Sequence, residues 1–174
     1  MYGPIVCEIT TKNANAATYL EQHVAQHVWQ SFVVESKEDY NLLYREVREK
    51  RGLKINIIII EGGELKQIRR KYTESMMETL KRDHGVMGYL DEFFEAPAAV
   101  MQALIESSNV QSVLVGSDKT QESLDKRGLL KMLTSSEDGS GTERDCCIFS
   151  TNMNKAFKVR STIDASFIQH EESD

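Results

Sequence analysis

The chain has 174 residues, of which 40% are hydrophobic and 28% are charged, and these proportions are ordinary for a soluble globular protein. The length is enough to bury a core in one domain or in two small lobes. The net charge of -6 argues against a protein that acts mainly by binding nucleic acid, because such proteins are usually basic. No apolar run approaches the roughly 20 residues of a membrane-spanning helix, and the first residues lack the pattern of a signal peptide.

The chain begins with a strand expected at residues 5–10, followed by a helix that Asn13 or Asn15 can cap. His23 and His27 lie four residues apart in this helix, which is a spacing that metal ligands use. The glutamate that the zinc-protease motif requires directly after the first histidine is absent, so that motif fails. Ordinary helix histidines are therefore favoured, and no metal site is predicted.

The next unit runs from one short apolar strand to another. Phe32–Val34 predicts a buried strand, and Ser36 is placed to cap the helix that follows it. An apolar stripe at helical spacing runs over residues 40–47, and Gly52 ends the helix. Lys54–Ile60 contains four consecutive isoleucines and predicts a strand that is buried on both faces at the centre of a sheet.

The second half opens after a polar, basic stretch at residues 64–85 that is expected to be part loop and part helix. The expected elements are a strand at 86–90, a helix after Pro97, a strand at 111–115, a helix near 119–126 and a strand near 129–133. An exposed connection at 135–142 leads to a closing pair of strands at 146–149 and 156–159, and the acidic tail from His170 is expected to fray.

Two stretches of the chain follow the same order of features. Residues 31–54 and residues 112–131 each contain a β-branched run, a turn with a capping serine, a polar helix, a glycine stop and a second apolar run. Two copies in one small chain predict a duplicated βαβ unit and an α/β fold.

Candidate chemical groups are few. Cys7, Cys146 and Cys147 give an odd count that fits a reducing compartment, and the adjacent pair must point to opposite faces of a strand. The acidic run Asp91, Glu92 and Glu95 lacks a neighbouring base, nucleophile or metal ligand, so a solvated face is favoured over acid–base catalysis. The basic cluster at 66–71 is either a solvated helix face or part of a track for nucleic-acid phosphates. No catalytic constellation and no cofactor motif stand out, which favours an interaction module.

The repeated units also resemble the two lobes of the hinge domain of the SMC (structural maintenance of chromosomes) proteins. The resemblance rests on Ser31–Asp39 with Arg51-Gly52 and the isoleucine strand, and on the second copy at 112–128. Residues 84–101, HGVMGYLDEFFEAPAAVM, and residues 115–120, VGSDKT, are similar to the fifth eukaryotic branch of the family. The resemblance covers essentially the whole chain.

The resemblance implies an SMC hinge fold of two pseudo-repeated lobes, each with a small mixed sheet and flanking helices. We expect lobe I at about 1–63, a connecting segment at about 64–85, lobe II at about 86–165 and a polar tail at 166–174. The implied function is a dimerisation hinge that pairs with the hinge of the sixth branch, Smc-six, and joins two coiled-coil arms in a nuclear, chromosomal protein active in DNA repair. The hinge itself would not be an enzyme, whereas the full-length protein would be an ATPase through its head domains.

The resemblance also implies contact sites, which we expect at sheet edges left open for a partner strand. The second-lobe contact is expected from Cys146, Cys147, Ile148, Phe149, Ser150, Thr151 and Asn152. Weak binding of single-stranded DNA is expected from Lys66, Arg69, Arg70, Lys71, Lys81, Arg82, Lys155, Lys158 and Arg160.

One feature departs from the SMC pattern. Typical SMC hinges carry a Gly-Gly pair after a short apolar strand at the dimer interface, whereas this chain has Ser150-Thr151-Asn152 after Ile148-Phe149. We therefore expect one of the two contacts of the hinge ring to be weaker or differently built. The alternative function is a small α/β enzyme or nucleotide-binding domain, which would need a deep pocket with convergent polar groups.

Overall fold

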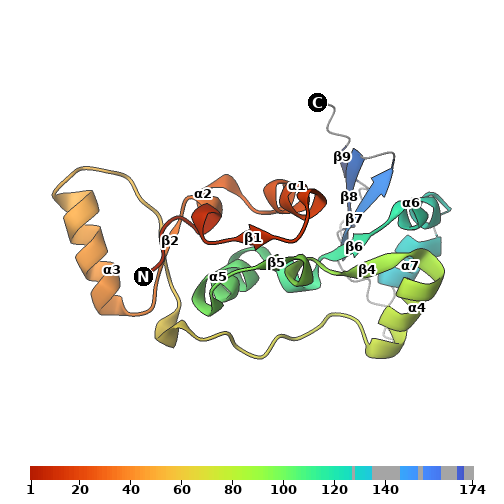
Figure 1. Ribbon diagram of the computed structural model, residues 1–174, viewed down its shortest axis with the longest axis horizontal. Coiled ribbons are helices and arrows are strands. Elements are labelled where there is room, and N and C mark those ends of the chain that lie inside the picture. Colours follow the sequence, from red (N-terminus) through yellow and green to blue (C-terminus); the bar gives the residue numbers. More distant parts are fainter. Residues whose placement is uncertain (127, 135–145, 153–154, 162–167, 171–174) are drawn as a thin grey trace. The chain divides into compact units, whose positions relative to one another are not determined.

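The computed structural model describes residues 1–126, 128–134, 146–152, 155–161 and 168–170, and the side chains of Asp125 and of residues from 151 onward lie outside the description. The chain forms two compact units (Figure 1). Unit 1 comprises Met1–Arg69 and Phe93–Val110, and unit 2 comprises Arg70–Glu92 and the chain from Gln111 onward. The units do not follow the contiguous lobes expected from the sequence, because Phe94–Glu95 pairs with Thr10–Thr11 and returns the chain to unit 1.

Unit 1 is mostly helical and contains two short two-stranded sheets. Its elements in chain order are η1 (Ile5–Cys7), β1 (Thr10–Thr11), α1 (Ala14–His23), α2 (Gln26–Trp29), β2 (Phe32–Val34), α3 (Lys37–Leu43), η2 (Tyr44–Glu49), β3 (Ile57–Ile59), η3 (Glu61–Gly63), β5 (Phe94–Glu95) and α5 (Ala98–Ser108). The α5 helix packs against β2, and α3 packs against both β2 and β3. The core is made by fully buried side chains that include Ile5, Ala16, Leu20, Val33, Val34, Val100 and Leu104.

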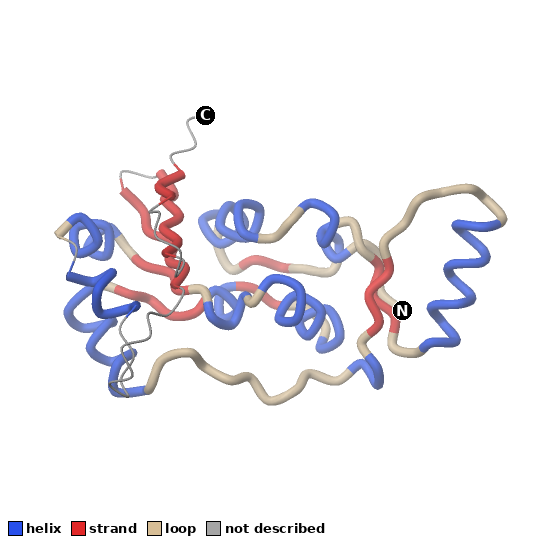
Figure 2. The backbone as a smooth tube through the Cα atoms, turned by 180° about the vertical axis from the view of Figure 1, so that it is seen from behind, coloured by secondary structure: helices blue, strands red, loops and turns tan. Residues whose placement is uncertain are grey.

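Unit 2 is built on a five-stranded sheet of order β4-β6-β7-β8-β9. Its elements are α4 (Glu74–His84), β4 (Val86–Tyr89), η4 (Leu90–Phe93), β6 (Leu114–Gly116), α6 (Asp118–Asp125), α7 (Gly128–Thr134), β7 (Cys146–Asn152), β8 (Lys155–Ser161) and β9 (Ile168–His170), with the turn η5 (Val110–Ser112) leading into β6. Figure 2 shows the strands of this sheet and those of unit 1 in red. The core includes Leu80, Leu114, Leu129, Leu133 and Ile148, all fully buried.

A duplicated βαβ plan is present, as the sequence predicted, but the second copy ends in a different strand from the expected one, because residues 129–133 are helical and β7 takes their place. In unit 1 the chain runs from β2 through α3 to β3, and these two strands are parallel. In unit 2 it runs from β6 through α6 and α7 to β7, and β6 and β7 are also parallel. The capping serines act as expected, since the Ser36 hydroxyl accepts a hydrogen bond from the backbone N–H of Asp39, and Ser117 begins a capping box with Thr120.

Three predicted strands are wrong in position or type. Residues 5–7 form a 3-10 turn rather than a strand, and the strand in this region is only Thr10–Thr11. The apolar run at 129–133 is part of α7, where Leu129 and Leu133 are buried one helical turn apart. Short apolar runs fit a buried strand and a buried helix equally well, so periodicity alone could not separate them.

The isoleucine strand is the third case. The strand covers only Ile57–Ile59, and it lies at the edge of a two-stranded parallel sheet instead of at the centre of a larger one. All three side chains are half-buried, and Ile60 is the one isoleucine of the run that is buried. The sequence correctly indicated that these isoleucine side chains need burial, but contacts within the chain bury them only in part.

Candidate partner and nucleic-acid surfaces

The outer edge of β3 exposes a backbone ready for strand pairing. On its inner side, the Phe32 N–H donates to the Asn56 carbonyl at 2.9 Å, and the Ile60 N–H donates to the Val34 carbonyl at 2.8 Å. Backbone groups alternate in direction along a strand, so those of Ile57 and Ile59 point away from β2. Within the described part of the chain no further strand pairs with this edge.

The other side of β2 is already occupied. Tyr2 forms an antiparallel bridge with Val33, in which the Tyr2 N–H donates to the Val33 carbonyl at 2.8 Å. The open edge of this sheet is therefore the β3 side. Apolar side chains near it are only partly covered, since α3 has no buried residue and Leu53 is 56% exposed.

The strand β7, which holds the predicted second-lobe contact, is not an edge. It lies between β6, with which it pairs in parallel, and β8, with which it pairs antiparallel from Cys146↔Ser161 to Asn152↔Lys155. The side chains of Cys146, Ile148, Phe149 and Ser150 are buried within unit 2, and that of Cys147 is half-buried. The expectation of a free edge here is wrong because β8 returns as a hairpin and covers it.

The predicted basic residues at 66–71 lie on a segment without helix or strand, drawn as a long loop in Figure 2. The expected helix face is therefore wrong. The Lys66 backbone N–H donates to Gln102 Oε1 at 3.0 Å, and its ammonium pairs with Glu106 at 3.3 Å. Hydrogen bonds from Gln102 and from Lys66 lower the pKa of Glu106. Arg69 is exposed.

Arg70 has a structural partner that sequence reasoning missed. Its guanidinium donates to both carboxylate oxygens of Asp91, at 2.7 and 3.1 Å, and lies 4.5 Å from the centre of the Tyr89 ring. Burial acts to lower the pKa of Arg70, but the hydrogen bonds and charge of Asp91 outweigh burial and raise it. Asp91 is 8% exposed, so the solvated face expected for it is wrong. Glu92 also acts locally, since its carboxylate accepts the Tyr89 N–H at 2.7 Å.

The remaining predicted cations are spread over unit 2. The Lys71 ammonium lies 5.9 Å from the Tyr72 ring centre, and Lys81 and Arg82 are exposed in the last turn of α4. Arg82 pairs with Asp83 at 2.9 Å. Lys155, Lys158 and Arg160 lie on β8, and their side chains lie outside the described residues. Lys66 and Arg69 belong to unit 1, so the predicted set divides between the two units.

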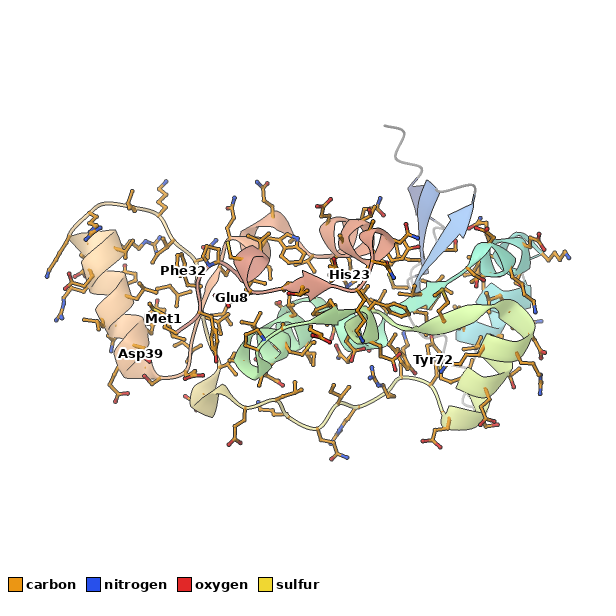
Figure 3. The ribbon with its side chains drawn as sticks, in the orientation of Figure 1. Met1, Glu8, His23, Phe32, Asp39 and Tyr72 are labelled. Atoms are coloured by element: carbon orange, nitrogen blue, oxygen red, sulfur yellow. The ribbon has the colours of Figure 1, made fainter. Side chains whose placement is uncertain are left out.

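The histidine pair does not share a helix. The α1 helix ends at His23, Val24 and Ala25 are extended, and His27 lies in α2. His23 is labelled in Figure 3. Its Nε2 lies 2.5 Å from the Ser108 carbonyl oxygen. Among the described residues, no group of histidine, cysteine, aspartate and glutamate side chains is arranged to hold a metal ion. No helix of the described chain has the length and apolar character needed to cross a membrane.

A hollow of about 580 Å³ lies on the helix formed by α3 and η2, and sequence reasoning did not identify it as a site. Its walls are the side chains of Tyr40, Asn41, Tyr44, Arg45, Arg48 and Glu49. The sequence signal was present, because the tyrosines and Arg48 recur every four residues, but the tyrosines were assigned to the apolar face of the helix.

Comparison with known proteins indicates what kind of molecule carries these surfaces. No protein-family model matches the chain. Over 122 residues the chain is 27% identical to Structural maintenance of chromosomes protein 5 of Arabidopsis thaliana, a match that covers 70% of this chain and 11% of that protein. The chain therefore spans about a tenth of the length of this curated relative.

Two crystal structures of hinge domains are similar to this chain. The S. pombe Smc5/6 hinge domain matches with a TM-score of 0.61 and 16% identity, over 92% of this chain and 59% of that one. An asymmetric dimer of the Geobacillus stearothermophilus SMC hinge domain matches with a TM-score of 0.54 and 14% identity, over 96% of this chain and 53% of that one. The predicted α/β hinge fold is confirmed by these likenesses.

Proposed function

We propose that this chain, which has the fold of an SMC hinge and a sequence similar to the fifth SMC protein, is a dimerisation hinge that pairs with the hinge of Smc-six. The observation that carries the proposal is the open outer edge of β3, where backbone groups of Ile57 and Ile59 point away from the sheet. In the full-length protein such pairing would join two coiled-coil arms. The ATPase heads, the nuclear and chromosomal location and the role in DNA repair are parts of the same proposal.

The physical argument is that unit 1 is incomplete by itself. A strand from a partner would satisfy the outward N–H and C=O groups of β3 and cover its half-buried isoleucines. Backbone pairing fixes the register, and the isoleucine side chains add apolar area, so the contact would be both specific and stable. A contribution from residues 146–152 stays a prediction, and it cannot come from a free edge because β7 is paired on both sides.

The experiment is to mix the chain with the Smc-six hinge and measure molar mass by light scattering, first for the native sequence and then for Ile57→Pro. Proline at the first residue of an edge strand keeps the bonds to β2 and removes one outward N–H donor. We expect a 1:1 species with the native chain and at least tenfold weaker association with the variant.

Val6→Lys is the control, because Val6 is 58% exposed and lies in η1 instead of on the β3 edge. This variant should associate normally, and melting temperatures should show that both variants fold. A native chain that remains monomeric with its partner would refute the proposal.

We also propose auxiliary binding of single-stranded DNA, with a smaller set of cations than the sequence suggested. Arg69, Lys81 and Arg82 are exposed, whereas Arg70 is held by Asp91. The affinity should fall steeply with salt, as binding to phosphates requires. Charge reversal should be made at Arg69 alone, because reversal of Arg70 would disrupt the ion pair as well. Unchanged affinity in Arg69→Glu would move the DNA contact away from this segment.

The alternative, a small α/β enzyme or nucleotide-binding domain, has less support. Such proteins bind ligands in enclosed crevices at the carboxyl ends of their strands. The hollow described above instead opens on the side of the α3 and η2 helix, and its walls hold no nucleophile with an adjacent base. A nucleotide that raises the melting temperature of the purified chain would favour this alternative.

A further inference from the structure

The hollow on α3 and η2 presents two aromatic rings side by side. The ring centres of Tyr40 and Tyr44 are 5.9 Å apart, and the planes meet at 22°, so the rings stack with an offset. Both side chains are half-buried, so the helix holds them in place while part of each ring faces the solvent. Figure 3 draws the side chains around this helix, with Asp39 labelled in its first turn.

A guanidinium completes the stack. The central carbon of the Arg48 guanidinium lies 5.4 Å from the Tyr44 ring centre, within the distance of a cation–π contact. In the described part of the chain Arg48 has no carboxylate within ion-pair distance. Two rings and a planar cation therefore follow one another along one side of the helix, in the order Tyr40, Tyr44 and Arg48.

The backbone beneath this flank is a π-helix, which is rare and occurs frequently at functional sites. The Lys50 N–H donates to the Arg45 carbonyl at 3.0 Å, five residues back instead of four. A wider turn changes the spacing of side chains around the axis, and the π-helix Tyr44–Glu49 contains four of the residues that line the hollow.

Charge near the hollow favours an anionic ligand. Residues 45–54 contain five basic and two acidic side chains. Glu46 pairs with Arg45 at 3.7 Å and with Lys50 at 2.6 Å, which leaves Arg48 beside the rings. Arg51 and Lys54 follow in the chain, and both are exposed.

We infer that Tyr40, Tyr44 and Arg48 form a stacking site for unpaired bases of single-stranded DNA, with Arg51 and Lys54 contacting the adjacent phosphates. The inference rests on the proposed DNA-binding role and assigns it to a surface that the sequence analysis did not. Flat rings with a nearby guanidinium are what sequence-tolerant single-strand binding uses, because every base has a face that can stack. Double-stranded DNA keeps its bases stacked on each other, so it could not use the rings. An acidic peptide would need the cations but not the rings.

The test is photocrosslinking and affinity measurement with oligo(dT) that carries 5-iodouracil. We expect the cross-linked peptide to contain Tyr40 or Tyr44. Tyr44→Leu keeps apolar volume on the helix but removes a ring, and it should weaken binding roughly tenfold, within the range of alanine substitutions at stacking rings. Arg48→Gln should also weaken binding, because it removes the stacked guanidinium. Arg51→Gln should reduce the slope of log affinity against log salt by about 0.7, for the one phosphate-neutralising charge lost.

Matched controls are Tyr2→Leu, which removes a ring outside the α3 and η2 helix, and Lys126→Gln, which removes an exposed charge in unit 2. Each should change affinity less than twofold. Cross-links elsewhere, together with native affinity in both Tyr44→Leu and Arg48→Gln, would overturn the inference and leave the proposed DNA binding intact. A native chain that binds no oligo(dT) even at low salt would overturn both the inference and the proposed DNA binding.

Duplex DNA and oligo(U) of equal length serve as competitors. Duplex DNA that competes as well as oligo(dT) would also overturn the inference.

Discussion

At the residue scale, the pair of Arg70 with Asp91 is the least exposed of the ion pairs in the described part of the chain. Asp91 is buried and Arg70 is one-third exposed, so removing the carboxylate leaves a cation that water solvates only in part. We expect Asp91→Ala to lower the free energy of unfolding by about 2 kcal/mol, less than for a fully buried pair because Arg70 retains some solvent contact. Urea denaturation measures the loss.

The matched control is Asp83→Ala, because Asp83 forms a pair of similar length with Arg82 at the surface. That variant should change stability by no more than about 0.5 kcal/mol. Equal losses in the two variants would show that burial of the Asp91 pair contributes nothing.

Gly85 allows a second comparison at this scale. It ends α4 with φ of 68°, and an added Cβ would lie 2.5 Å from the Ser117 hydroxyl oxygen and 2.9 Å from Lys119 Cβ. Gly52 has a similar φ of 66°, but a Cβ there would meet no atom within 4 Å. Gly52→Ala should therefore lower the free energy of unfolding by roughly 1–2 kcal/mol, because alanine disfavours the left-handed backbone. Gly85→Ala should lower it by roughly 1–3 kcal/mol more, because the added Cβ also meets close neighbours. Similar melting temperatures for the two variants would contradict the close packing at Gly85.

Local spacing predicted the residues whose partners are near in sequence. Asn13 and Ser36 cap their helices as expected, since each needs only a backbone N–H three residues on. Asp91 was misjudged because its partner lies 21 residues earlier, and no spacing rule links an acidic run to a distant arginine. The stacked tyrosines were visible as a pattern, but the pattern of a binding surface is the same as that of a packed helix face.

At the element scale, the segment after η3 is held to α5 by one buried amide. Gln102 is 3% exposed and accepts the Lys66 N–H through Oε1, while its Nε2 donates to Glu106. In Gln102→Leu we expect the Lys66 amide to exchange with deuterium roughly 2–10 times faster, as the loss of one hydrogen bond implies. Glu106→Gln keeps this acceptor and removes the exposed ion pair to Lys66, so exchange should hardly change. Equal exchange in both variants would mean that Gln102 does not hold the segment.

Elements whose burial is completed within the chain were easier to predict than the others. The helix after Pro97 and the closing strand pair lie where expected, and the apolar residues of α5 and the first residues of β7 are buried inside their own units. The isoleucine run was placed at the centre of a sheet because four consecutive isoleucines need burial, and composition could not show that the chain itself provides only part of it. That shortfall is the strongest indication of a partner.

At the scale of the whole molecule, the two units share one plan, a parallel βαβ unit with a serine-capped helix, but they complete it differently. Unit 2 extends its sheet with β8 and β9 and buries β7 inside it. In unit 1 the corresponding sheet stops at β3, and its outer edge is left open by the described part of the chain. The repeat was predictable from the sequence, whereas this asymmetry depends on which strands return as hairpins. We therefore expect the partner to contact unit 1 through β3.

The most direct measurement is residue-resolved amide hydrogen exchange of Ile57 and Ile59, with and without the Smc-six hinge. The inward amide of Ile58 should be protected in both states, whereas the two outward amides should exchange quickly alone and become at least tenfold slower in the complex. Fast exchange at Ile57 and Ile59 in a saturated complex would contradict strand pairing at this edge.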